Sequence, residues 1–147
     1  MTIEIQPCKI SHLHRLMGSL RAEERAELDI MRIKPRHAMI ALWKATPEPW
    51  AAVDETEQVL AVWGDAAPTL ASIGLPWVFS GSAIERVPLW FFREVRRQIE
   101  KMLVSRETLR CEIAAGCTKA LRFYALVGFE IGEAVDGFHQ VTYAIRR

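Results

Sequence analysis

The side chains that could act as nucleophiles or metal ligands in this chain include three cysteines and four histidines. Cys8, Cys111 and Cys117 are odd in number and lack both metal-ligand spacing and a C-x-x-C arrangement, so we expect neither a zinc site nor a disulfide framework. Cys117 could be a nucleophile, but no base stands beside it in the sequence, which favours a small buried apolar side chain. His139 is expected on a strand, where a single histidine is more often a surface or hydrogen-bonded residue than a catalyst.

Composition indicates one globular domain spanning residues 1–147, because half of the chain is hydrophobic and a quarter is charged. A net charge of +1 gives no reason to expect nucleic acid or an anionic membrane as partner. The segment Met1–Pro7 does not resemble a signal peptide, and no apolar window has the length of a membrane span. Free cysteines fit a reducing cytoplasm.

Hydrophobic periodicity predicts strands and helices in alternation. The predicted strands are Thr2–Gln6, Trp50–Val53, Val59–Gly64, Thr69–Phe79, Thr108–Ala114, Phe129–Ala134 and Phe138–Ile145. The predicted helices are one capped by Ser11, then Arg21–Met31, one beginning at Pro35, Pro88–Leu103 and Thr118–Val127. This order indicates an α/β fold with a mixed sheet.

Three local signals refine this prediction. Gly74 and Pro76 predict a bulge within the Thr69–Phe79 strand. Asp136-Gly137 predicts a tight hairpin turn. The Pro88–Leu103 helix has the length of a right-handed crossover between parallel strands.

The segment Cys117–Phe129 resembles the late motif N-x-x-A-x-x-F-Y-x-x-x-G-F of the GCN5-related N-acetyltransferases (GNAT), and the element order resembles that family's fold along nearly the whole chain. The matching motif positions are Ala120, Phe123, Tyr124, Gly128 and Phe129. Cys117 stands where the family has asparagine. The resemblance implies a mixed, mostly antiparallel twisted sheet of six or seven strands flanked by helices.

The resemblance also implies a reaction, the transfer of an acetyl group from acetyl-CoA to an amine. Tyr124 would protonate the departing thiolate, since a phenol with a reference pKa of about 10 holds its proton at pH 7. Cys117 and Phe123 would contact the cofactor. The alternative role for Tyr124 is packing over the sheet with its hydroxyl satisfied.

The family's phosphate loop, Q/R-x-x-G-x-G/A, is altered in this chain. Glycines there let backbone N–H groups approach the pyrophosphate at a helix N-terminus. Here Gly81 is the only glycine of the Gly81–Leu89 segment, Glu85 adds negative charge, and Pro88 has no N–H to donate. The resemblance implies a cofactor-binding set in and before this segment: Phe79, Ser80, Gly81, Ser82 and Arg86. The alternative is a capped helix start with Pro88 in its first turn.

A narrower resemblance links the chain to internal virion protein A and its relatives, small proteins of short-tailed bacteriophages. At the C-terminal end it rests on Phe123–Phe129 and Asp136–Tyr143. In the N-terminal half it rests on Leu20–Glu27, Pro35–Trp43 and Trp50–Gly64. It implies a phage or prophage protein of the bacterial cytoplasm or the virion.

Three functions stay open on the sequence: an N-acetyltransferase, a catalytically inactive GNAT-fold protein of virion morphogenesis or host interaction, and a regulatory module that binds another nucleotide-like anion. The general base is unassigned among Glu85, Glu112 and His139. Partners would be a coenzyme A thioester and an amine or protein acceptor, with a second copy of the chain or a virion or host protein as alternatives. Five tryptophans would offer apolar area to such a partner: Trp43, Trp50, Trp63, Trp77 and Trp90.

Overall fold

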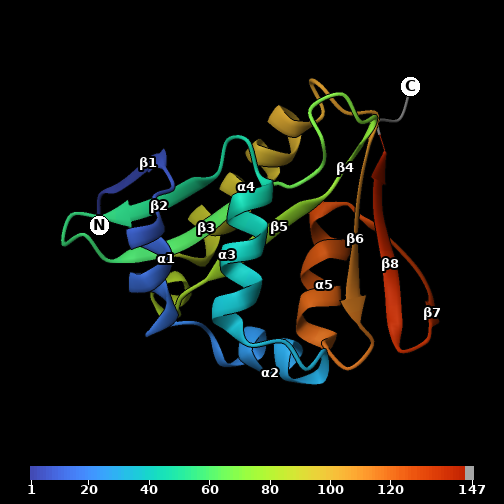
Figure 1. The fold of residues 1–147 in the computed structure, drawn as a ribbon, viewed down its shortest axis with the longest axis horizontal. Coiled ribbons are helices and arrows are strands. Elements are labelled where there is room, and N and C mark those ends of the chain that lie inside the picture. The colour runs from blue at the N-terminus through green and yellow to red at the C-terminus, as the bar shows by residue number, and fades with distance from the viewer. Residues whose placement is uncertain (145–147) are drawn as a thin grey trace. The chain divides into compact units, whose positions relative to one another are not determined.

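The computed structural model of the chain describes residues 1–144, which fall into two compact units. The first unit contains residues 1–66 and 77–88, and the second contains residues 67–76 and those from 89 onward. Each unit has its own sheet and its own buried core (Figure 1). That the whole chain is a single domain stays a prediction.

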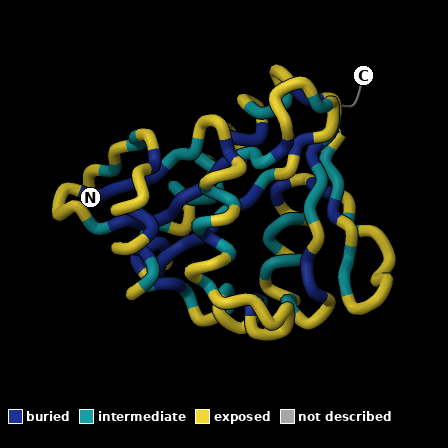
Figure 2. The backbone as a smooth tube through the Cα atoms, in the orientation of Figure 1, coloured by how far each residue is buried: buried dark blue, intermediate teal, exposed yellow. Residues whose placement is uncertain are grey.

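The sheet of the first unit has the strand order β1-β2-β3-β5. Its strands are β1 (Ile3–Pro7), β2 (Trp50–Asp54), β3 (Val59–Asp65) and β5 (Pro76–Ser80). Its helices are α1 (Ile10–Met17), α2 (Ala22–Ile30) and α3 (Pro35–Ala45). The pairs β1/β2 and β2/β3 are antiparallel, and β2 and β3 are buried along almost their whole length, as the dark tube in Figure 2 shows.

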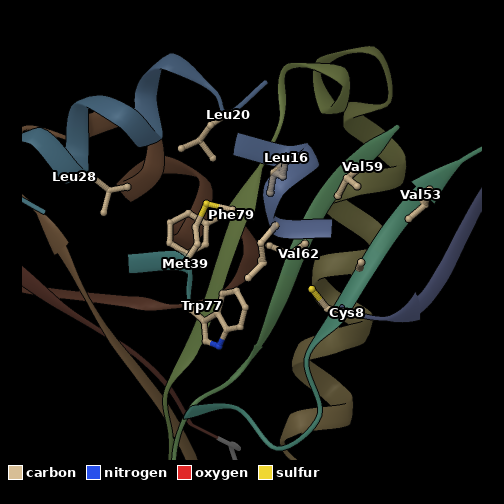
Figure 3. Packing of buried hydrophobic residues seen from close by; sticks show 12 residues of the cluster. Cys8, Leu16, Leu20, Leu28, Met39, Val53, Val59, Val62, Trp77 and Phe79 are labelled. Carbon is tan, nitrogen blue, oxygen red and sulfur yellow. The ribbon is translucent and has the colours of Figure 1, made fainter. Parts of the chain in front are cut away.

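One core cluster of the first unit is built from side chains of the three helices and the sheet. Leu13, Leu16 and Met39 have no exposed surface. Trp77 and Phe79 of β5 pack into the same cluster, with their rings tilted and 5.9 Å apart (Figure 3). The cluster therefore joins two periodic patterns: apolar side chains at helical spacing on α1, and every second side chain of β5.

Two details of the predicted helices are wrong. The residue before α1 is Lys9 rather than Ser11, and its backbone N–H donates to Nδ1 of His12 at 2.8 Å, so the ring nitrogen takes the role that the N3 side chain has in a capping box. The helix predicted over Arg21–Met31 is shorter, because α2 ends at Ile30 and Met31 follows it, 40% exposed. The prediction that Pro35 begins a helix is confirmed.

The sheet of the second unit has the strand order β4-β6-β8-β7. Its strands are β4 (Ile73–Gly74), β6 (Thr108–Ala114), β7 (Glu130–Val135) and β8 (Phe138–Ala144), and its helices are α4 (Pro88–Met102) and α5 (Thr118–Val127). In this sheet β4/β6 is a parallel pair, whereas β6/β8 and β7/β8 are antiparallel. The turn between β7 and β8 has positive φ at Asp136 and Gly137, which confirms the predicted hairpin.

The predicted strand Thr69–Phe79 is two strands in different sheets. Ile73 and Gly74 pair with β6, whereas Pro76–Ser80 lies beside β3. Leu75 separates them, and Pro76 has no N–H with which to continue a ladder. Residues 1–144 therefore form eight strands in two sheets instead of six or seven in one, and the α/β, mostly antiparallel class is confirmed.

Within the described residues, three further features concern function: membrane-spanning helices, metal-ligand groups and the burial of the tryptophans. None of the helices within residues 1–144 has the length and apolar character needed to cross a membrane. No group of three or more His, Cys, Asp or Glu side chains in that range could hold a metal ion. All five tryptophans are buried or half-buried, and a tryptophan-lined partner surface stays a prediction.

A buried arginine orders the segment that leads into β4. Arg106 is 8% exposed, and its guanidinium donates to the carbonyl oxygens of Pro68 (2.7 Å) and Ala67 (3.1 Å), and also to those of Thr69 and Ala71. Ala67–Ala71 has no helix or strand of its own; the Pro68 carbonyl also accepts from the Ala71 N–H at 3.0 Å, and Arg106 supplies the other donors to this segment's carbonyls.

Replacing Arg106 with Ala should lower the free energy of unfolding by about 3 kcal/mol, because several carbonyl oxygens lose a charged donor. Chemical denaturation measures the change. Arg106→Lys should recover only part of it, since one ammonium cannot span four carbonyls. Equal stability of the Ala variant and the unchanged protein would contradict this role.

Gly128 ends α5 with φ of +123°, and a Cβ there would lie 2.9 Å from Cε2 of Tyr143. Gly128→Ala should therefore reduce stability by about 2 kcal/mol through backbone strain and a steric clash. The matched control is Gly18→Ala, where φ is −70° and nothing lies within 4 Å of the added carbon. Thermal unfolding of both variants checks the difference, and an equal loss at the two positions would refute the explanation.

Candidate functional site

The outer edge of β5 is the first part of the candidate site. Gly81, just after β5, points its N–H to the carbonyl of Leu60 on β3 at 2.8 Å. Backbone groups of successive strand residues point to opposite edges, so those of Ser80 face away from β3. By the same alternation, the N–H and C=O of Val78 face this outer edge too.

The segment linking α1 to α2 lies along that edge. The N–H of Arg21 donates to the carbonyl of Ser80 at 3.1 Å, and the N–H of Ser82 donates to the carbonyl of Ser19 at 2.8 Å. Leu20 and Gly81 form an antiparallel bridge. A Cβ on Gly81 would lie only 3.0 Å from Leu16 and 3.1 Å from the Ser19 hydroxyl, so the glycine permits this close approach.

Glu24 on α2 completes the coverage of Ser80. Both carboxyl oxygens of Glu24 accept from the Ser80 N–H at 2.9 Å, and one also accepts from the Ser80 hydroxyl at 3.2 Å. Withdrawal of this carboxyl from water raises its pKa to about 8, although the bonds from Ser80 and the charge of Arg21 act in the opposite direction. Sequence reasoning missed Glu24, because it stands in a charged helix 56 residues from its partner.

The phosphate-loop segment forms a 3-10 helix, Ser82–Arg86, before α4 begins at Pro88. The N–H groups of Ile84 and Val87 donate within the segment. Arg86, the predicted phosphate cation, donates to the side chain of Gln58 at 3.0 Å, and the Glu85 carboxylate lies 3.7 Å from the Arg21 guanidinium.

The structure thus gathers the predicted loop residues in the first unit, but their polar groups bond to other parts of that unit. Phe79 is a buried member of the core cluster. Ser80, Ser82 and Arg86 bond to α2, the α1–α2 link and the β2–β3 turn, respectively.

Tyr124 lies in the second unit within a series of aromatic contacts. Its ring meets Phe123 edge-on at 6.1 Å and Phe129 at 5.1 Å. Phe123 stacks on Phe91 of α4 at 5.4 Å, and Phe129 meets Tyr143 of β8 at 5.2 Å. These contacts hold the half-buried phenol ring in one orientation.

Cys117 is half-buried at the N-terminus of α5 and packs against the core cluster of the second unit. The structure therefore brings Cys117, Phe123 and Tyr124 together on one helix. Cys8, in the first unit, is buried, which raises the pKa of its thiol to about 11.

The three base candidates from the sequence differ in their surroundings. Glu85 is exposed beside Arg21, and Glu112 is exposed on β6, where it lines a shallow acidic hollow with Glu133 and Asp136. His139 on β8 has Nδ1 2.7 Å from the carbonyl oxygen of Gly132. None of these contacts identifies Glu85, Glu112 or His139 as the general base.

Solved structures with the same fold include several N-acetyltransferases. The GNAT domain of S. lividans PAT superposes with a TM-score of 0.71 at 12% identity, over 99% of this chain and 92% of that one. The spermidine N-acetyltransferase from Vibrio cholerae, solved with CoA and spermine, gives a TM-score of 0.67 at 10% identity, over 97% and 95% of the two chains. An aminoglycoside N(6′)-acetyltransferase from Legionella pneumophila gives 0.63 at 11% identity, over 97% and 91%.

No protein-family model and no curated protein matches the sequence. The similarity therefore concerns the fold, and it extends over nearly the whole chain. The altered loop and the late motif are thus parts of a structure with the fold of the GCN5-related N-acetyltransferases.

Proposed function

We propose that this protein is an N-acyltransferase that moves an acetyl group from acetyl-CoA to an amine. The observation that carries the proposal is the nearly full-length match to N-acetyltransferase structures, one of which was solved with CoA. The Ala120–Phe129 motif, on α5 and the two residues that lead to β7, supports it independently.

Two groups of the chain would supply the chemistry. The outer edge of β5 offers the N–H of Val78 as a donor to a carbonyl that gains negative charge during acyl transfer. The phenol of Tyr124 would give its proton to a departing thiolate, and the aromatic contacts of its ring would limit the orientations of the hydroxyl. Acetyl-CoA, when bound, supplies the activated acyl group.

The phosphate-loop segment is less suited to binding a coenzyme than the late motif is. The N–H groups of Ser80, Gly81 and Ser82 already have internal acceptors, and Gly81 accommodates Ser19 where a glycine could admit a phosphate. This observation favours a second candidate, a GNAT-fold protein without catalytic activity.

The phage part of that second candidate rests on the sequence resemblance alone, since no comparison supports it. A role in virion morphogenesis or host interaction stays a prediction. Tail, portal or lysis genes beside this gene would support it.

Calorimetric titration of the purified chain with acetyl-CoA separates the two candidates. We expect saturable binding in the micromolar range, because the helix termini and the late motif of the fold are retained. The control ligand is pantetheine, which lacks the nucleotide phosphates. Absence of binding at millimolar acetyl-CoA would leave only the non-catalytic candidate.

Replacing Tyr124 with Phe tests the proposed acid. Loss of the phenolic proton should lower kcat for acetylation of amines about 100-fold, while KM for acetyl-CoA changes little, since the ring contacts remain. Tyr143→Phe is the matched control, because Tyr143 belongs to the same aromatic series. Release of free thiol from acetyl-CoA measures both variants. Full activity of Tyr124→Phe would assign Tyr124 to packing alone.

A further inference from the structure

The outer edge of β5, whose backbone groups the proposed function needs, is bonded at Ser80 to another part of the first unit. Ser80 is the last residue of β5, and its N–H, hydroxyl and carbonyl all bond to the segment Arg21–Glu24. An edge strand exposes a row of donors and acceptors that can pair with any extended ligand. Here a piece of the same chain takes that place.

We propose that Glu24 is a displaceable internal ligand, whose carboxyl closes the outer edge of β5 at Ser80 until α2 moves away and opens that edge to the acyl donor. The proposal rests on the proposed function for the identity of the donor. The closure itself rests on the contacts at Ser80.

Three features favour a displaceable contact over a fixed one. α2 places one buried residue, Leu28, in the core, so little apolar packing holds the helix. The residues that follow it, Met31 and Ile33, are exposed. Leu20 is the one buried side chain of the link, and its other contacts are polar: the bonds around Ser80, the Arg25 bond to the Met17 carbonyl, and a 3.7 Å ion pair between Arg21 and Glu85, which is weak at that exposure.

The charges around Glu24 set the direction of its response to pH. Arg21 favours the ionised carboxyl and Glu27 disfavours it, Glu23 pairs with Arg21, and Ser80 donates two bonds. Burial outweighs these bonds and raises the pKa from 4.5 to about 8 in the closed form. An exposed carboxyl in the open form would keep its ordinary pKa, so the proton stabilises the closed form. That stabilisation is complete below about pH 4.5 and is lost as pH rises through about 8.

The test compares Glu24→Ala and Glu24→Gln with the unchanged chain. The amide of Gln still accepts from the Ser80 N–H but cannot ionise, whereas Ala removes the acceptor. We expect amide hydrogen exchange at Ser80 to be about fivefold faster in Glu24→Ala, and acetyl-CoA to bind about fivefold more tightly, because one neutral hydrogen bond no longer competes. Asp29→Ala, an exposed position on the same helix, should alter neither quantity.

A second experiment varies the pH and needs no substitution that removes the hydrogen-bond acceptor. Between pH 7 and 9, exchange at Ser80 should rise more in the unchanged chain than in Glu24→Gln, which corrects for the intrinsic effect of base. Equal rises in the two proteins, or unchanged exchange in Glu24→Ala, would overturn the closure. Weaker acetyl-CoA binding by Glu24→Ala would contradict the proposal that Glu24 and acetyl-CoA compete for the edge of β5.

Failure of the proposed function has a different signature. If no variant binds acetyl-CoA, the acyltransferase proposal and the donor part of this inference are refuted together. The exchange measurements then still decide whether Glu24 closes the edge.

Discussion

A single stretch of chain, Ile73–Ser80, supplies one edge strand to each of two sheets. Several contacts described above follow from that arrangement. Its first part pairs with β6 and its second part lies beside β3, so each part is an edge strand. The change occurs at Leu75 and Pro76, where proline cannot donate to either ladder. Backbone groups left on an outer edge need partners from elsewhere, and at β5 the first unit supplies them.

In the first unit, the partners come from the α1–α2 link and from Glu24. A Cβ at Gly81 would lie 3.0 Å from Leu16 and 3.1 Å from the Ser19 hydroxyl, so a side chain there would require these neighbours to shift. The glycine of the altered phosphate loop therefore has a packing explanation, and the charge at Glu85 has a partner in Arg21. Of the residues that depart from the acetyltransferase loop, Glu85 pairs with Arg21 of the covering segment, and the nearby Ser80 and Ser82 also bond to that segment. Loss of the loop pattern and closure of the edge are thus two aspects of one arrangement.

In the second unit, Arg106 supplies the donors that Ala67–Ala71 lacks, and the late motif serves packing as well as the proposed chemistry. Gly128 adopts a backbone conformation that other residues rarely adopt and leaves room for Tyr143. Phe129 and Phe123 fix the ring of Tyr124 from two sides. A motif of this kind would persist for packing alone, which is why its presence supports catalysis without establishing it.

The sequence by itself determined the features that depend on neighbours along the chain. The Asp136-Gly137 hairpin, the helix beginning at Pro35 and the α5–β7 motif all follow from local conformational preferences and short-range periodicity. The α/β class followed from their order.

Tertiary structure alone decided which edges the strands share and which polar groups meet. The split at Leu75 was not predicted, because periodicity shows that a strand is present but not which partner it pairs with. The contact between Glu24 and Ser80 was not predicted either, since the burial that raises the pKa of that carboxyl comes from packing between segments 56 residues apart. No pattern in the charged run Arg21–Glu27 encodes that partner.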